Sequence, residues 1–152
     1  MTKRILLLTA MSLAALVAVL PAAAKTPPPL VVAQVGIEAA KLGVASGNID
    51  TATSKCTTKP CLAKSYTAFY TQAHVLDGAL ESLWKAAGKS GACASAAVNA
   101  GAGFDALTAS YHSLETATLK ADKAGATKAY GQIQVTTPHL TAILNSFKTK
   151  CR

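Results

Sequence analysis

Residues 60–87 read PCLAKSYTAFYTQAHVLDGALESLWKAA, and this stretch sets the architecture of the chain. Apolar and small residues recur in it at alternating intervals of four and three, at Leu62, Tyr66, Phe69, Ala73, Leu76, Leu80, Leu83 and Ala87. That period keeps all of them on one face of an α-helix, so the stretch predicts an amphipathic helix. Because Pro60 suits a first helical turn and Gly88 suits a helix end, we expect the helix over residues 60–88.

The same alternation continues in two further segments, which predict helices over residues 92–121 and 124–150. The first segment carries it at Cys93, Ala97, Ala100, Phe104, Leu107, Tyr111, Leu114, Thr118 and Ala121. The second carries it at Ala126, Tyr130, Ile133, Thr137, Leu140, Leu144, Phe147 and Cys151. Pro138 lies inside the last helix and predicts a kink, because proline lacks a backbone N–H and crowds the preceding turn.

Upstream, residues 29–46 predict a first helix with two neighbouring apolar rows. One row is Leu30, Ala33, Ile37, Ala40 and Val44, and the other is Val31, Val35 and Leu42. A helix that is apolar on two faces is either well buried or has a partner. The threonine-rich residues 46–59 are expected to form a long connection to the next helix.

Short turns between the later segments make neighbouring helices antiparallel, which predicts an all-α fold, an up-down-up-down four-helix bundle. Folding the last two helices back about residue 122 brings Phe104 opposite Leu140 and Cys93 opposite Cys151. The two cysteines match without any adjustment of the register. A Cys93–Cys151 disulfide would therefore join the start of one helix to the end of its neighbour.

The remaining cysteines predict a second, local disulfide, Cys56–Cys61, at the entry to the second helix. Other pairings would require opposite ends of the bundle to meet. Four intervening residues match neither a thioredoxin-type pair nor the close pairs of zinc sites, so we expect structural disulfides and no metal or other cofactor. An even number of cysteines in an exported chain indicates an oxidising location, periplasmic or secreted.

Export is predicted by residues 1–24, which have the pattern of a cleaved signal peptide. Lys3 and Arg4 precede an apolar stretch, residues 5–20, and small residues follow Pro21 up to Ala24. Sixteen apolar residues are too few to span a bilayer comfortably, so we expect no stable membrane insertion after cleavage. Removing 24 of the 152 residues leaves residues 25–152, which suit a single four-helix domain.

Loss of the signal removes two positive charges and lowers the formal net charge from +8 to +6. The remaining cations are lysines apart from Arg152, whereas nucleic-acid recognition usually relies on arginine and stacking aromatic residues. A nucleic-acid partner is therefore not expected. The lysines fall near the two ends of the predicted bundle, which suits either solubility or an anionic partner.

No catalytic centre is expected, so we predict a protein that is not an enzyme. The sequence has no nucleophile elbow. Its acids are expected to be scattered on helix surfaces without apolar surroundings that would raise their pKa values: Glu38, Asp77, Glu81, Asp105 and Glu115.

A small-ligand site is the alternative interpretation. In the predicted register His74, Asp105 and His139 lie at one level of the bundle, although on outward positions, and could bind a transition metal. Tyr70 and His74 lie four apart on one helix face, and this pair resembles the axial ligands of some bacterial haem carriers.

A partner surface is expected where apolar residues lie beside cations. Trp84 is on the rim of its helix, and edge aromatic residues either cap a core or anchor a partner. The candidate surface consists of Trp84, Val31, Val35, Leu42, Lys85, Lys89, Lys148 and Lys150.

A local disulfide at Cys56–Cys61 in an exported bundle is similar in outline to plant pectin methylesterase and invertase inhibitors, although the spacing to Cys93 and Cys151 differs from theirs. The expected function is a non-enzymatic exported binding protein, comparable to inhibitors or immunity proteins. Its rigid disulfide-braced surface would meet another protein or an anionic component of the cell envelope. The alternative is the small-ligand carrier described above.

Overall fold

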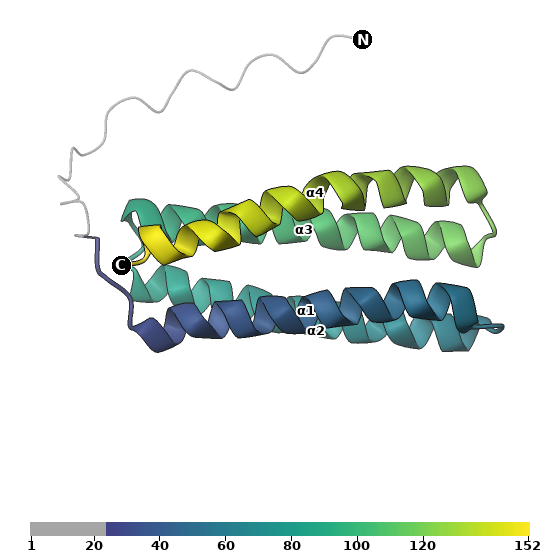
Figure 1. The fold of residues 1–152 in the computed structure, drawn as a ribbon, viewed down its shortest axis with the longest axis horizontal. Helices are drawn as coiled ribbons and strands as arrows, with labels where there is room; N and C mark the ends of the chain where they lie inside the picture. The colour runs from purple at the N-terminus through teal and green to yellow at the C-terminus, as the bar shows by residue number, and fades with distance from the viewer. Residues whose placement is uncertain (1–23) are drawn as a thin grey trace, which may run out of the picture.

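The computed structural model describes residues 24–152, which form four long helices. They are α1 (Pro29–Lys55), α2 (Lys59–Ala86), α3 (Gly91–Leu119) and α4 (Lys123–Lys150). Figure 1 shows them side by side as two antiparallel hairpins, α1 with α2 and α3 with α4. The predicted up-down-up-down four-helix bundle is therefore confirmed, whereas the predicted signal peptide lies almost entirely outside the described residues.

Both predicted disulfides are present. The Cys56–Cys61 bond clips the α1–α2 turn, with a Cα–Cα distance of 5.6 Å, and the Cys93–Cys151 bond joins α3 to the end of α4, with a Cα–Cα distance of 4.7 Å. Among residues 24–152 no cysteine is left free. Disulfides of this kind indicate an oxidising environment.

The register between α3 and α4 agrees with the expected one. A β-carbon placed on Gly103 would lie 2.5 Å from Leu140 Cδ2, so Leu140 packs directly onto the bare backbone of α3. Leu140 is buried, as is Ile133, two turns earlier in α4. Tyr130, however, is 45% exposed, and Ala129 is buried in its place.

The position of Tyr130 reflects uneven packing between the helices. The close pairs are α3 with α4, α1 with α2, and α2 with α3, whereas α1 and α4 pack much less closely. Figure 1 shows α4 running obliquely over α3. The buried face of α4 is therefore turned toward α3 rather than toward a point between α3 and α1.

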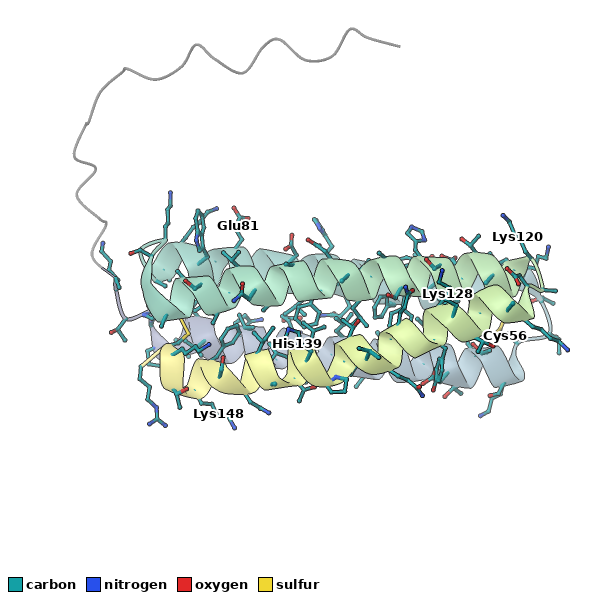
Figure 2. The ribbon with its side chains drawn as sticks, turned by 90° about the horizontal axis from the view of Figure 1, so that it is seen from above. Cys56, Glu81, Lys120, Lys128, His139 and Lys148 are labelled. Atoms are coloured by element: carbon teal, nitrogen blue, oxygen red, sulfur yellow. A yellow bond between two sulfur atoms is a disulfide. The ribbon has the colours of Figure 1, made fainter. Side chains whose placement is uncertain are left out.

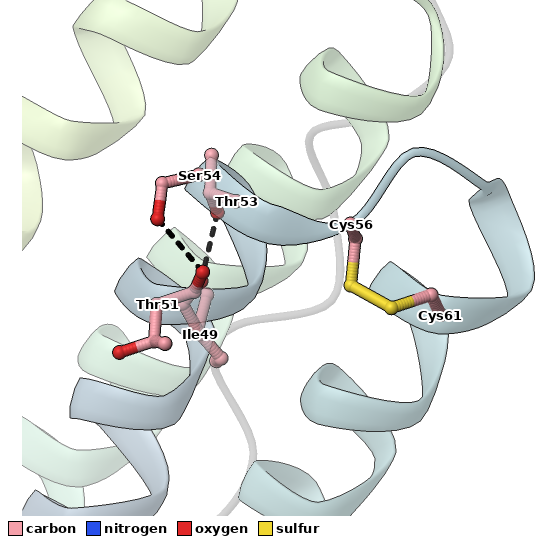
Figure 3. Close-up of a disulfide and its surroundings, with 6 residues drawn as sticks. All are labelled: Ile49, Thr51, Thr53, Ser54, Cys56 and Cys61. Atoms are coloured by element: carbon pink, nitrogen blue, oxygen red, sulfur yellow. Dashed lines mark hydrogen bonds between the residues drawn. A yellow bond between two sulfur atoms is a disulfide. The ribbon is translucent and has the colours of Figure 1, made fainter.

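Helix α1 is longer than expected, and the predicted loop over residues 46–59 is wrong for most of its length. The helix continues to Lys55 because Ile49 and Ala52 extend its buried row. The hydroxyls in this segment also bond within the helix (Figure 3): Thr53 Oγ1 donates to the Ile49 carbonyl at 2.8 Å, and Ser54 Oγ donates to the Thr51 carbonyl at 2.8 Å. Threonine and serine are tolerated here because each hydroxyl can donate to a backbone carbonyl in the preceding turn of the helix.

The two apolar rows of α1 have opposite environments. Val35 and Leu42 lie in the core with 0% and 3% of their surface exposed, and Val31 is partly buried against it. The prediction that Val35 and Leu42 belong to a partner surface is therefore wrong, whereas Val31 keeps part of its surface exposed. The row of Val35 and Leu42 continues through Ile49 to Cys56. It therefore supplies core residues along the whole helix, and it places Cys56 beside α2.

The glycine contact between α3 and α4 can be tested by substitution. We expect Gly103→Ala to be less stable than Gly101→Ala by about 1–3 kcal/mol, because the new methyl group must displace buried Leu140. At Gly101 nothing lies within 4 Å of an added β-carbon, so that control should gain roughly 0.5–1 kcal/mol from helix propensity alone. Urea denaturation measures both changes, and equal stabilisation by the two alanines would contradict the register.

Candidate functional site

One end of the bundle brings together three parts of the chain. The turn from α2 to α3 has left-handed backbone at Gly88, Lys89 and Gly91. The backbone N–H of Lys25 donates to the Ala87 carbonyl at 3.1 Å, which holds the described amino end against this turn. Since the Cys93–Cys151 bond adds the end of α4, we refer to this assembly as the basic end.

Trp84 lies partly exposed at the basic end. The Lys89 ammonium is 5.3 Å from the centroid of the Trp84 ring, within range of a cation–π interaction. The two side chains line a shallow hollow of about 220 Å³. Its other lining residues come from the first turns of α3: Ala94, Ser95, Val98 and Asn99. The hollow therefore combines an aromatic face, a cation and the half-exposed Val98.

Positive charge is concentrated at this end of the bundle. The cations of the basic end are Lys25, Lys85, Lys89, Lys148, Lys150 and Arg152. Within the described chain only Lys85 among them has a carboxylate within ion-pair distance, at 2.6 Å from Glu81. Figure 2 shows Glu81 and Lys148 at this end, with Lys120, Lys128 and Cys56 at the other. The predicted candidates Trp84, Lys85, Lys89, Lys148 and Lys150 thus lie at one end of the bundle, whereas Val35 and Leu42 are buried in the core.

The opposite end has a second basic surface. A groove of about 540 Å³ runs between α3 and α4 and contains Lys120, Lys128 and His112. Asp122 also lines it, but its Oδ1 accepts a 2.9 Å hydrogen bond from the Gly125 N–H and caps α4. This groove carries no aromatic residue other than His112.

The predicted metal ligands are not assembled into a site. His74, Asp105 and His139 are all exposed. Among residues 24–152 no group of three or more histidine, cysteine or acidic side chains is placed to hold a metal ion. The three helices carry these residues on divergent outer faces, so a common level along the bundle does not bring them together.

Tyr70 has partners on α3 rather than the predicted neighbour His74. Its hydroxyl donates to Glu115 Oε2 at 2.9 Å and lies 3.3 Å from His112 Nδ1, while the Tyr70 and His112 rings are 4.7 Å apart. Burial, followed by the hydrogen bond to Glu115, raises the pKa of Tyr70 well above its ordinary value. The Tyr70 hydroxyl is thus engaged with α3, and the hydrogen bonds of the structure do not join it to His74, the partner expected in the haem interpretation.

Glu38 was expected on a helix surface, and that expectation is wrong. Its side chain is only 4% exposed, between α1 and α2. Oε2 accepts a 2.7 Å hydrogen bond from Gln72, and Oε1 accepts from Gln34 at 2.6 Å and Lys41 at 3.0 Å. Hydrogen bonds from Gln72 and Lys41 hold the pKa of the Glu38 carboxyl below its ordinary value. The position of Glu38 in the row of Val35 and Leu42 is the sequence signal for this burial.

A cluster of aromatic residues fills the middle of the bundle. Phe69 of α2 packs against Tyr111 of α3 with ring centroids 4.2 Å apart, and the Tyr111 hydroxyl is hydrogen-bonded to Ser46 of α1. Tyr66 is completely buried, and among residues 24–152 its hydroxyl has no hydrogen-bond partner. Burial raises the pKa of Tyr66 to about 12. These tyrosines are core residues and offer no accessible ligand.

The other apolar row of α1 faces outward. Leu30, Ile37 and Val44 are 83%, 50% and 66% exposed, on the side of the helix opposite Val35 and Leu42. Among residues 24–152, α1 is also the helix whose length and mean hydropathy of 1.3 would suffice to cross a membrane. That hydropathy comes from both rows together, and the inner row is already packed in the core.

Comparison with known proteins adds no functional information. No protein-family model, no curated protein and no solved structure matches the chain.

The buried carboxylate predicts an acid-sensitive contribution to stability. A lowered pKa in the folded state means that ionised Glu38 stabilises the protein above its unfolded pKa, and this stability is lost as the pH falls through the folded pKa. We expect Glu38→Gln to remove part of the loss of stability as the pH falls below 4.5, the ordinary pKa of this carboxyl. Glu81→Gln is the control, because its exposed pair with Lys85 contributes little. Equal acid sensitivity of Glu38→Gln and the native protein would contradict the assignment.

The unpaired hydroxyl in the core predicts an unusual response to its removal. We expect Tyr66→Phe to leave the free energy of unfolding unchanged or to raise it by up to about 2 kcal/mol, because a buried unsatisfied group is lost. Tyr111→Phe should instead lower it by about 1 kcal/mol, since it leaves Ser46 without its partner. Chemical denaturation of both variants gives the comparison, and a marked loss in Tyr66→Phe would show that the hydroxyl is satisfied.

Proposed function

We propose that this chain is a non-enzymatic binding protein of an oxidising compartment outside the cytoplasm, and that its basic end captures an acidic protein. The observation that carries the proposal is the Trp84–Lys89 hollow at the end of the bundle that also holds the other cations of the basic end. Partly exposed tryptophan is a common anchor of protein interfaces, since it buries a large apolar area while keeping a polar edge.

The charges of the basic end suit a partner with exposed carboxylates. Five of its six cations have no carboxylate within ion-pair distance in the described chain. Unpaired lysines around an aromatic anchor attract an acidic surface over long range and increase the association rate. If cleavage follows Ala24, the Lys25 nitrogen that contacts Ala87 becomes a terminal amine and adds one more positive charge.

Rigidity of the basic end also supports binding. The Cys93–Cys151 bond holds α3 and α4 together beside the hollow, and the Lys25–Ala87 hydrogen bond holds the amino end. A surface that is ordered before binding loses less conformational entropy when the complex forms. No comparable combination of tryptophan and hollow occurs in the groove at the opposite end.

The proposal predicts loss of a partner when the basic end is altered. Immobilised residues 25–152 would be exposed to envelope and secreted fractions of the source cells, and bound proteins identified by mass spectrometry. We expect an acidic protein whose binding weakens with salt and falls at least about tenfold in the Trp84→Ala, Lys89→Ser double variant. The control is Lys120→Ser with Lys128→Ser, which alters the opposite end and should retain binding. Equal losses in both variants, or no partner retained specifically by the native protein, would contradict the proposal.

A further inference from the structure

The outward face of α1 is an apolar stripe with a regular composition. Its members alternate at intervals of three and four and are all exposed: Leu30, Ala33, Ile37, Ala40, Val44 and Gly47. Large side chains occupy every seventh position, and the residues between them are alanine or glycine. Nothing else in the described chain covers this face, because the core contacts of α1 are made by Val31, Val35, Glu38, Leu42 and Ile49 on the other side.

The glycines of α1 are not explained by contacts inside the molecule. At Gly36, Gly43 and Gly47 an added β-carbon would meet nothing within 4 Å, and all three lie in the helix interior. Each costs roughly 0.5–1 kcal/mol of helix stability relative to alanine. Because these three residues have no side chain, they leave the backbone of α1 accessible on its outer surface. Another helix backbone can therefore approach closely.

From the pattern of the stripe we infer that α1 packs against α1 of a second copy of this chain, in antiparallel orientation. In an antiparallel pair, the positions that carry large residues on one helix lie opposite the positions that carry alanine or glycine on the other. Large side chains therefore meet small ones. A twofold axis between residues 38 and 39 places Leu30 opposite Gly47 of the second copy and Ile37 opposite Ala40 of the second copy. In the parallel orientation Leu30 would meet Leu30 and Ala33 would meet Ala33, so crowded layers would alternate with voids.

The flanks of the stripe are compatible with the same axis. On one side the nearest flanking neighbour of Lys41 is Gln34 of the second copy, offset by two residues along the axis, so no like charges face each other. On the other side the nearest flanking neighbour of Gly36 is Gly43 of the second copy, offset by two residues, and the absence of side chains there permits close contact. The carboxylate of Glu38 is turned toward α2 and engaged by Gln72, so it does not oppose the contact.

The extent of the stripe sets the expected affinity. From Leu30 to Gly47 it is about 27 Å long, at a rise of 1.5 Å per residue. One helix from each copy buries less than the roughly 1,200 Å² of the smaller stable interfaces, so the dimer should be weak and dependent on concentration. Both ends of the bundle are basic, and in the dimer the ends of one copy lie beside the ends of the other. Salt should strengthen the dimer because it screens the repulsion between these positive charges.

Sedimentation equilibrium of oxidised residues 25–152 over a wide concentration range tests this inference. We expect a monomer–dimer equilibrium that shifts toward dimer with added salt. Ile37→Lys should raise the dissociation constant of the dimer about tenfold or more, because a charge would be buried at the centre of the contact. Val135→Lys is the matched control, since Val135 is 76% exposed on α4 and outside the stripe, and it should dimerise like the native protein.

The orientation can be tested separately by cross-linking. A Leu30→Cys chain mixed with a Gly47→Cys chain should form a disulfide-linked heterodimer, whereas Leu30→Cys alone should not link to itself. Circular dichroism and mapping of the two native disulfides establish that each variant is folded. Linkage of Leu30→Cys to itself would overturn the antiparallel arrangement.

Two further outcomes would overturn the inference as a whole. One is a native protein that stays monomeric at every concentration, or a Val135→Lys variant that loses the dimer as readily as Ile37→Lys. The other is a monomer that binds phosphatidylcholine vesicles and loses that binding in Ile37→Lys, which would place a bilayer on the stripe. Since the stripe shares no residue with the basic end, capture of an acidic protein is judged independently by the Trp84 and Lys89 variants.

Discussion

The packing of α2 against α3, centred on Phe69 and Tyr111, holds the two halves of the molecule together. Each disulfide lies within one hairpin, Cys56–Cys61 in the first and Cys93–Cys151 in the second, so no covalent bond other than the chain itself joins them. The aromatic contact between Phe69 and Tyr111, together with the hydrogen bond between Tyr111 and Ser46, therefore sets how the hairpins lie relative to each other. The hollow at Trp84 spans α2 and α3 and depends on the same packing.

The surface separates charge from apolar area. Cations are concentrated at the two ends, while the exposed apolar row follows the middle of α1. The two features favour different contacts with opposite responses to salt, because screening weakens attraction to an acidic partner and reduces repulsion between two basic copies. The two proposals thus place two contact surfaces on one small bundle, one at the basic end and one along α1.

Much of the fold and part of the candidate surface can be predicted from spacing. Cys93 and Cys151 pair because both follow the apolar period of their helices, and the register that matches Phe104 with Leu140 also matches the cysteines. Trp84 and Lys89 come together because they lie five residues apart across a helix end. The pairing of Tyr70 with Glu115 and His112 could not be predicted in this way, since it depends on how α2 and α3 rotate about their axes.

Local periodicity and cysteine spacing are properties of the chain alone, and they were sufficient for four helices, their order and both disulfides, because each depends on intervals along the sequence. The inner face of α1 required the tertiary structure. Two rows of that helix are equally apolar near its start, and only the packing against α2 selects the row of Val35 and Leu42, buries Glu38 with it and leaves Leu30, Ile37 and Val44 exposed. A helix can present only one of its faces to the core, and neighbouring helices rather than its own composition determine which.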